Sequence, residues 1–237
     1  MTRRRWIADQ VSGDRATLVG SHAEHLSRVL RAKVGQEFDI ATGTTVRRGK
    51  ISAISPDQVE FNLGEEVLVA AVPNITLVLS IFKFDRMEWT IEKCTELGVS
   101  QIIPLIAQRS ENHLVAASSK RLERWRKIAK QASEQSRRAT TPEISSPIEL
   151  KELVRLRSGV RILLAEDEQE TSLAELVDSD GHGQAVSLAC GPEGGWTKTE
   201  VDTFRGAGWL SASLGPTILR AETAAISALA VVLSRLH

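Results

Sequence analysis

The chain has 237 residues, 42% of them hydrophobic, and its 30 Lys and Arg residues balance its 30 Asp and Glu residues. This length and apolar content suffice for one large domain or two smaller ones, and they exclude a chain that is disordered throughout. The zero net charge excludes a histone-like binder, but the charge is unevenly placed. Residues 1–50 and 119–138 are basic and could meet phosphates, whereas the acidic run over residues 165–202 is interpreted as a solvated face.

We expect neither a membrane span nor a secretion signal. The longest uncharged stretch, residues 67–82, has 16 residues and is interrupted by Pro73, whereas a bilayer span needs about 20 apolar residues. The basic residues 3–5 resemble the start of a signal peptide, but no long apolar core follows them. Cys94 and Cys190 are the only cysteines and lack metal-ligand spacing. We therefore expect a cytoplasmic protein with two buried thiols and no metal site.

The first seventy residues or so predict a small β-rich domain. Short apolar runs at residues 38–41, 46–54 and 59–63 are separated by turn sequences, which is typical of strands. A single helix is predicted over residues 22–31, with Ser21 as its N-cap and Leu26, Val29 and Leu30 on one side.

After Pro73, apolar runs alternate with amphipathic segments, which indicates an α/β domain with a mostly parallel sheet. Strands are predicted at residues 75–82, 101–106, 160–165, 185–189 and 209–213, and helices at 87–97, 120–137, 150–157, 198–205 and 221–236. A domain boundary is therefore expected near residues 70–74. The last helix is apolar around most of its circumference, so we expect it to be buried in a core or an interface.

The helix expected at residues 120–137 has two different sides. Leu122, Trp125, Ala129 and Ala132 recur at helical spacing and form a packing face, and lysines and arginines occupy the rest. A solvated surface helix and an RNA contact are equally supported by this pattern alone.

The most specific local motif is Gly191-Pro192-Glu193-Gly194-Gly195. It follows an apolar strand and precedes Thr197 and Glu200, which have the spacing of a capping box at the start of a helix. Loops at the carboxyl ends of parallel strands line the ligand crevice of open α/β sheets. The motif lacks the glycine spacing of a dinucleotide loop and the Gly-Lys of a phosphate loop, so a phosphate cradle is disfavoured. A tight turn without a ligand remains the alternative.

A second loop, residues 213–224, again joins an apolar run to a helix. Its backbone could hold an adenine edge, while Leu214, Ile218 and Leu219 supply apolar walls. That combination suits S-adenosylmethionine, which carries a sulfonium and no phosphate. For each leucine taken singly, core packing is the alternative.

Several longer segments carry a resemblance to a known family. They are residues 191–195, 214–223, 82–89 and 93–99, together with 25–31, Trp125 with 128–129, and 134–136 with Arg138 and Pro142. In their order along the chain, and over nearly its whole length, these segments resemble the uridine N3-methyltransferases of ribosomal small-subunit RNA. Residues 108–111 fit that family's strand-end arginine segment only loosely.

The resemblance implies a fold, a cofactor and partners. It implies a PUA-like β-barrel that helps bind RNA over residues 1–72, and a SPOUT methyltransferase domain over residues 73–237. The latter is an α/β fold with a mostly parallel sheet whose C-terminal chain forms a trefoil knot. It also implies S-adenosylmethionine as cofactor, a homodimer, and 16S ribosomal RNA or the small ribosomal subunit as partner.

The same resemblance implies candidate site residues. The cofactor-binding candidates are Leu164, Gly191, Glu193, Gly194, Leu214, Gly215, Ile218, Leu219, Arg220 and Thr223. The catalytic candidates are Arg220, Glu88 and Glu96, with Asp85 as a further acidic candidate, and the RNA-binding candidates are Arg28, Arg31, Lys83 and Arg138. For each acidic residue, a structural ion pair with Lys83 or Lys93 is the alternative.

The expected reaction is methyl transfer from S-adenosylmethionine to N3 of a uridine in 16S ribosomal RNA. N3 must lose its imide proton and lies on the Watson–Crick edge, so the target base should be unpaired or splayed out. A SPOUT enzyme acting on a ribose 2′-hydroxyl or a tRNA base is the nearest alternative. A non-catalytic RNA-binding assembly factor is an alternative of a different class, and a dinucleotide oxidoreductase is a distant third.

Overall fold

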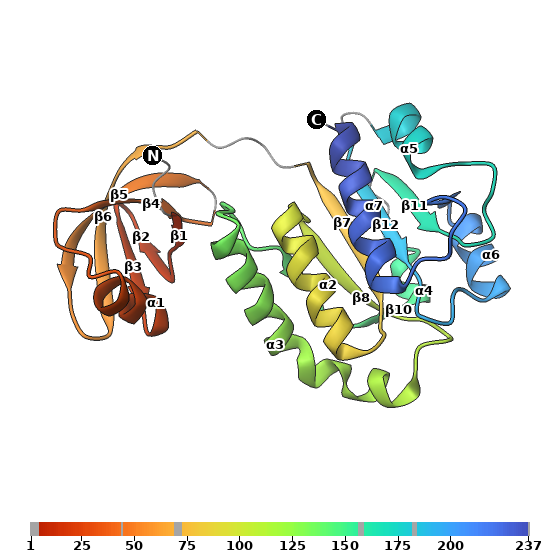
Figure 1. Cartoon of the computed structure of the whole chain (residues 1–237), viewed down its shortest axis with the longest axis horizontal. Coiled ribbons are helices and arrows are strands. Elements are labelled where there is room, and N and C mark those ends of the chain that lie inside the picture. Colours follow the sequence, from red (N-terminus) through yellow and green to blue (C-terminus); the bar gives the residue numbers. More distant parts are fainter. Residues whose placement is uncertain (1–4, 44, 69–72, 156–158, 182–183, 237) are drawn as a thin grey trace. The chain divides into compact units, whose positions relative to one another are not determined.

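The computed structural model describes residues 5–43, 45–68, 73–155, 159–181 and 184–236 (Figure 1). The chain divides into two compact units, residues 1–71 with 133–141, and residues 72–132 with 142–237. The first unit is therefore discontinuous in sequence, because a segment from the end of a long helix, α3 (Asn112–Gln135), packs with it.

The first unit is built on a six-stranded sheet. Its strands are β1 (Arg5–Ile7), β2 (Gln10–Ser12), β3 (Arg15–Val19), β4 (Glu37–Ala41), β5 (Val46–Ile54) and β6 (Gln58–Glu66). They lie in the order β1-β4-β5-β6-β3-β2, with β1 parallel to β4 and the other pairs antiparallel. The two outer strands, β1 and β2, are consecutive in the chain, so the sheet curves until its edges approach each other. Alternate residues such as Leu18, Ile51 and Phe61 are fully buried on one face.

The helix expected over residues 22–31 is only partly correct. Helix α1 (Ser21–Glu24) begins at Ser21 after Gly20, so Ser21 is its first residue rather than its N-cap. The chain then widens into a π-helical turn, η1 (His25–Val29). This wider turn changes the phase of the side chains, and although Leu26 is buried as expected, the side chain of Val29 is 64% exposed.

A histidine connects residues 133–141 to the rest of the first unit. The Nε2 atom of His22 lies 3.0 Å from Oε2 of Glu134, and its Nδ1 atom lies 3.3 Å from Oδ2 of Asp9. The hydrogen bond with Glu134, followed by its charge and the contacts with Asp9, raises the pKa of His22 despite the opposing effect of burial. The Arg5 guanidinium also donates to the backbone carbonyl of Arg137.

The second unit contains a parallel sheet covered by helices on both faces (Figure 1). Its strands are β7 (Ile75–Ser80), β8 (Gln101–Ile106), β9 (Glu143–Ile144), β10 (Ile148–Glu149), β11 (Val160–Leu164), β12 (Val186–Cys190) and β13 (Leu210–Ala212). The order is β10-β8-β7-β12-β11-β13, with β9 also paired to β8, and every pair is parallel. The mostly parallel α/β sheet expected from the sequence is confirmed.

Alternation along the strands creates two separate cores. Leu77 and Leu79 of β7 face the core formed with α2 (Phe84–Leu97), α3, α5 (Leu173–Leu176) and α7 (Ala221–Leu236). Val78 faces the opposite core, formed with α4 (Leu150–Leu153) and α6 (Lys198–Gly206). Both sides of the sheet are thus buried, as continuous apolar runs indicate.

The packing face of α3 is confirmed, because Trp125 and Ala129 are fully buried and Ala132 is 4% exposed. The helix begins at Asn112, eight residues before its expected start. Helix α4 ends at Leu153, and the last residues of the helix expected at 150–157 lie outside the described residues. No described helix is long and apolar enough to cross a membrane.

Candidate active site

A cavity of about 730 Å³ lies at the carboxyl ends of the parallel strands. Most of its lining comes from three segments that begin with the last residue of a strand: residues 164–167 at the end of β11, 190–196 at the end of β12 and 212–221 at the end of β13. Arg86 at the start of α2 and Arg109 after β8 complete the wall next to the second of these segments. The two glycine-containing loops picked out from the sequence therefore meet at one cavity, at the edge of the sheet where α/β folds bind ligands.

The Gly191–Gly195 loop is held in a tight turn. The Gly195 N–H donates to the carbonyl of Pro192 at 2.9 Å, and Gly195 has a φ of 68°, which favours glycine. A Cβ at position 191 would lie 3.2 Å from the indole of Trp196, so only glycine fits this approach without displacement. The loop ends in the expected capping box of Thr197 and Glu200, which starts α6.

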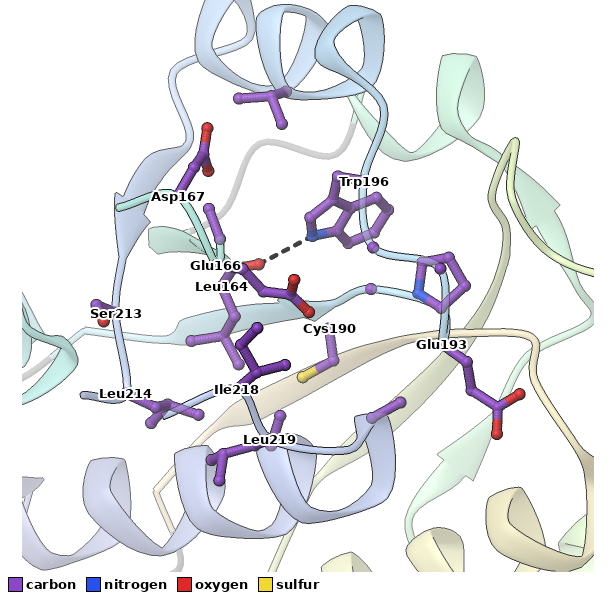
Figure 2. Close-up of a pocket in the computed structure, with 18 of the residues that line it drawn as sticks. Leu164, Glu166, Asp167, Cys190, Glu193, Trp196, Ser213, Leu214, Ile218 and Leu219 are labelled. Carbon is purple, nitrogen blue, oxygen red and sulfur yellow. Dashed lines mark hydrogen bonds between the residues drawn. The ribbon is translucent and has the colours of Figure 1, made fainter. Parts of the chain in front are cut away.

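Trp196 connects two of the three segments. Its indole Nε1–H donates to the carbonyl of Leu164 at 2.9 Å (Figure 2). Its ring also meets Phe204 edge-on, with 5.1 Å between ring centroids. The loop after β12 is therefore attached to the end of β11 by a directional bond and to α6 by an aromatic contact.

A second attachment comes from the segment after β8. The Arg109 guanidinium donates to the carbonyl of Gly194 at 2.8 Å and to that of Trp196 at 3.3 Å. The Gln108 N–H donates to the buried Glu200 carboxylate at 2.8 Å. These bonds attach the loop and the start of α6 to the segment after β8, and they give Arg109 a structural role.

Apolar side chains line one part of the cavity. Leu164, Leu214, Ile218 and Leu219 project toward the same space, with the Cys190 thiol beside them (Figure 2). Burial raises the pKa of Cys190 to about 12, and it raises the pKa of the buried Cys94 well above its ordinary value. Both cysteines are free and buried, as expected, and Cys190 serves as an apolar wall rather than as a nucleophile.

Two carboxylates border the cavity from the segment after β11. Glu166 and Asp167 are exposed side chains at the end of that strand, and both line the cavity (Figure 2). Both residues are solvent-exposed, as the interpretation of the acidic run as a solvated face expects, and they also line the cavity. Carboxylates here can accept hydrogen bonds from hydroxyl or ammonium groups of a ligand.

The structure brings most of the predicted cofactor residues together. Leu164, Gly191, Glu193, Gly194, Leu214, Gly215, Ile218, Leu219 and Arg220 line the cavity, and Thr223 is absent from the lining. The predicted catalytic glutamates lie elsewhere on α2. Glu88 is 2.6 Å from Arg124 and 3.6 Å from Arg121, and Glu96 is 2.9 Å from Lys93. Asp85 is exposed in the first turn of that helix.

The predicted RNA-binding residues differ in accessibility. Arg28 is exposed and paired with Glu24 at 2.8 Å, and Arg31 is exposed with a φ of 50°. Lys83 is exposed at the N-cap of α2. Arg138 is only 9% exposed, and burial lowers its pKa to about 10. Three of these four side chains are thus accessible at the surface.

An ion-pair network borders the cavity beside the glycine loop. Arg86 Nη1 lies 2.6 Å from Oε1 of Glu193, and Arg86 Nε lies 3.8 Å from Oε1 of Glu222 at the start of α7. Sequence reasoning missed Arg86, Glu166, Asp167 and Trp196. The strand-end rule that identified the glycine loops also points to Glu166 and Asp167, because they follow a predicted strand directly. Within the described residues, no group of His, Cys, Asp or Glu side chains is placed to hold a metal ion.

The sequence of this α/β domain matches the model of a recognised protein family. Residues 70–233 match the RNA methyltransferase domain family, so the second unit is an RNA methyltransferase domain.

Relatives define the family more narrowly. The chain is 31% identical over 214 residues to the ribosomal RNA small subunit methyltransferase E of Rickettsia conorii, covering 89% of this chain and 86% of that one. A crystal structure of the Neisseria gonorrhoeae ribosomal RNA small subunit methyltransferase E bound to S-adenosylmethionine superposes with a TM-score of 0.85, at 28% identity, over 99% of this chain and 98% of that one. A methyltransferase from Legionella pneumophila with bound cofactor gives 0.84 at 29% identity, with the same coverage. The chain belongs to the ribosomal RNA small subunit methyltransferase E family.

Proposed function

We propose that this protein transfers the methyl group of S-adenosylmethionine to N3 of a uridine in 16S ribosomal RNA. Family membership makes it a small-subunit ribosomal RNA methyltransferase with S-adenosylmethionine as cofactor. The choice of uracil N3 rests on the motifs of residues 82–89, 93–99 and 214–223, which resemble the N3-methylating enzymes. The structural observation that carries the proposal is the convergence of three strand-end segments on one cavity.

The residues around the cavity fit the cofactor. An apolar surface for the flat adenine ring is offered by Leu164, Leu214, Ile218 and Leu219. The two glycine loops line the same cavity, so their backbone N–H and C=O groups can form hydrogen bonds with the edge of the adenine. Glu166 and Asp167 suit the hydroxyl and ammonium groups of the ligand. The bound cofactor supplies a methyl group on a sulfonium centre, and the protein supplies positioning.

The chain's own groups must orient the uracil and favour loss of its N3 proton. Arg220 is exposed at the rim of the cavity, and its guanidinium would stabilise the negative charge that develops on the deprotonated base. The ion pairs of Glu88 and Glu96 favour the structural alternative for these two residues. Arg28, Arg31 and Lys83 are the exposed cations that we assign to the RNA backbone.

We further propose the finer architecture of the family for this chain. Consecutive outer strands in the first unit support a PUA-like barrel that helps bind RNA. In the second unit, the chain leaves the outermost strand β13 and returns over residues 213–220 to α7, which packs against α2, β7 and β12. That return supports a trefoil knot in a SPOUT domain. A homodimer is supported by Ile226 and Val231 of α7, which remain only partly buried in one chain.

The test uses RNA from a strain that lacks the gene. The full-length protein, tritiated S-adenosylmethionine and either intact small subunits or naked RNA are combined, and the modified nucleotide is then mapped. A methyl group on N3 blocks Watson–Crick pairing and stops reverse transcription, whereas a 2′-O-methyl group leaves that edge free and protects the next phosphodiester from alkali. Label at a uridine with a reverse-transcription stop is expected. Label at an alkali-resistant ribose, or in tRNA alone, would overturn the N3 assignment.

A further inference from the structure

Arg86 stands between two carboxylates that belong to different parts of the cavity wall. Glu193 lies within the Gly191–Gly195 loop, and Glu222 is the second residue of α7. Arg86 itself comes from the first turn of α2, 107 residues before Glu193. One guanidinium with several donors in a rigid fork can hold both groups at once.

The contact with Arg86 holds the Glu193 side chain away from the apolar part of the cavity. Its Oε1 accepts a 2.6 Å hydrogen bond from Arg86, and in Figure 2 the Glu193 side chain points away from the apolar group formed by Leu164, Ile218 and Leu219. Because its neighbours Pro192 and Gly194 also line the cavity, fixing this side chain fixes the backbone that faces the ligand. A glycine-rich loop has many accessible conformations, so such an anchor has a large effect on its position.

The contact with Glu222 involves a carboxylate that is costly to bury. Glu222 is 7% exposed, and its Oε2 atom has no hydrogen-bond partner among the described residues. The positive end of the α7 dipole and the nearby Arg86 compensate its charge. Arg86 is therefore held toward α7, while its Nη1 atom reaches the glycine loop.

We propose that Arg86 is a positioning residue of the methyl-donor site, which holds the Gly191–Gly195 loop against the start of α7 through Glu193 and Glu222. The inference deepens the proposed function and rests on it only for the identity of the ligand. In this role Arg86 acts through the loop and the helix that it holds, and not on the reacting atoms. It sets the distance between the loop after β12 and the helix that follows the loop after β13.

The test measures binding of S-adenosylmethionine to full-length protein by titration calorimetry. Removing a charge-assisted hydrogen bond that orders the site predicts a dissociation constant about tenfold higher for Arg86→Gln and for Glu193→Gln. Because Glu193→Gln breaks only the Arg86–Glu193 contact, which Arg86→Gln also breaks, the double variant should bind no more than about twofold more weakly than Arg86→Gln alone. Arg86→Lys should fall between wild type and Arg86→Gln, since a single ammonium cannot span both carboxylates.

The matched control is Arg235→Gln, which breaks an exposed ion pair with Asp178 of 3.1 Å at the other end of α7. It should leave both binding and the unfolding midpoint of the ligand-free protein unchanged. If Arg86→Gln does not fold, Glu193→Gln provides the test, because the Glu193 side chain is 30% exposed and its replacement should disturb the fold less. Dissociation constants within twofold of wild type for both single variants, or effects that multiply in the double variant, would overturn the inference. Wild-type protein that binds the donor but leaves N3 unmodified would contradict the proposed function alone.

Discussion

Glu200 is a buried carboxylate on which two parts of the cavity wall depend. It is 1% exposed, and both of its oxygens are used. Oε1 accepts from the Gln108 N–H at 2.8 Å, and Oε2 accepts from the N–H and hydroxyl of Thr197 at 2.8 and 2.9 Å. Replacing it by glutamine keeps the shape but puts an NH₂ group opposite one of two backbone N–H donors.

The cost of Glu200→Gln follows from these contacts. A charge-assisted hydrogen bond contributes about 1.5–3 kcal/mol, and a buried donor left without a partner costs about 1–3 kcal/mol. Because the amide oxygen still serves one of the two sites, these effects overlap, and we expect a loss of about 2–4 kcal/mol in the free energy of unfolding. Urea unfolding followed by circular dichroism, with an unchanged dependence on denaturant, measures this loss.

Glu175→Gln is the matched control. Glu175 forms the same capping box with Ser172 at the start of α5, where hydrogen bonds from the Ser172 hydroxyl and backbone lower the pKa of its carboxyl group. That site is exposed, and among the described residues no backbone N–H outside the capping box donates to Glu175 as that of Gln108 donates to Glu200, so its replacement should cost much less. Equal losses at the two positions would show that burial and the bond to Gln108 contribute nothing, and the reasoning would fail.

Two further changes test other contacts. Trp196→Phe removes the hydrogen bond to the Leu164 carbonyl, of about 1 kcal/mol, and should raise the dissociation constant of S-adenosylmethionine by up to about fivefold in calorimetry. The control is Trp209→Phe. The ring of Trp209 also packs on Phe204, but its indole N–H is buried without a hydrogen-bond partner among the described residues. Equal changes in the dissociation constant for the two variants would contradict a role for the bond between Trp196 and Leu164. The raised pKa of His22 predicts a stabilising contribution that is fully present below its ordinary value of 6.5 and is lost as pH rises through the higher folded value. The midpoint of thermal unfolding of the wild type should fall as pH rises from below 6.5 through the raised pKa of His22. The same fall in His22→Gln would show that His22 is not its cause.

The long elements were predictable because periodicity is a local property. Strand β8 and helix α7 have the bounds expected from the sequence, residues 101–106 and 221–236. Helix α2 ends at its expected last residue, Leu97, because Gly98 follows with a φ of 117°. Strands β9 and β10 have two residues each, and α5 has four. Such elements are too short to show a period, and their neighbours in the fold determine them.

The position of the site was predictable because it depends only on which loops follow the parallel strands. Glycine loops after strands belong at one edge of a parallel sheet, and the structure places both there. The supporting contacts depend on tertiary structure instead. Trp196 reaches a carbonyl 32 residues away, and Arg109 reaches one 85 residues away. Neither separation leaves a local signal, which is why Trp196 was missed and the role of Arg109 was not defined.

The discontinuity of the first unit has a consequence for biosynthesis. Chains emerge from the ribosome N-terminus first, so strands β1 to β6 are available long before residues 133–141, which pack with them. The His22–Glu134 contact can form only after α3 has been translated. Folding of the first unit can therefore be completed only after part of the second unit has been synthesised. A fragment ending at residue 71 would lack the contacts that residues 133–141 make in the first unit.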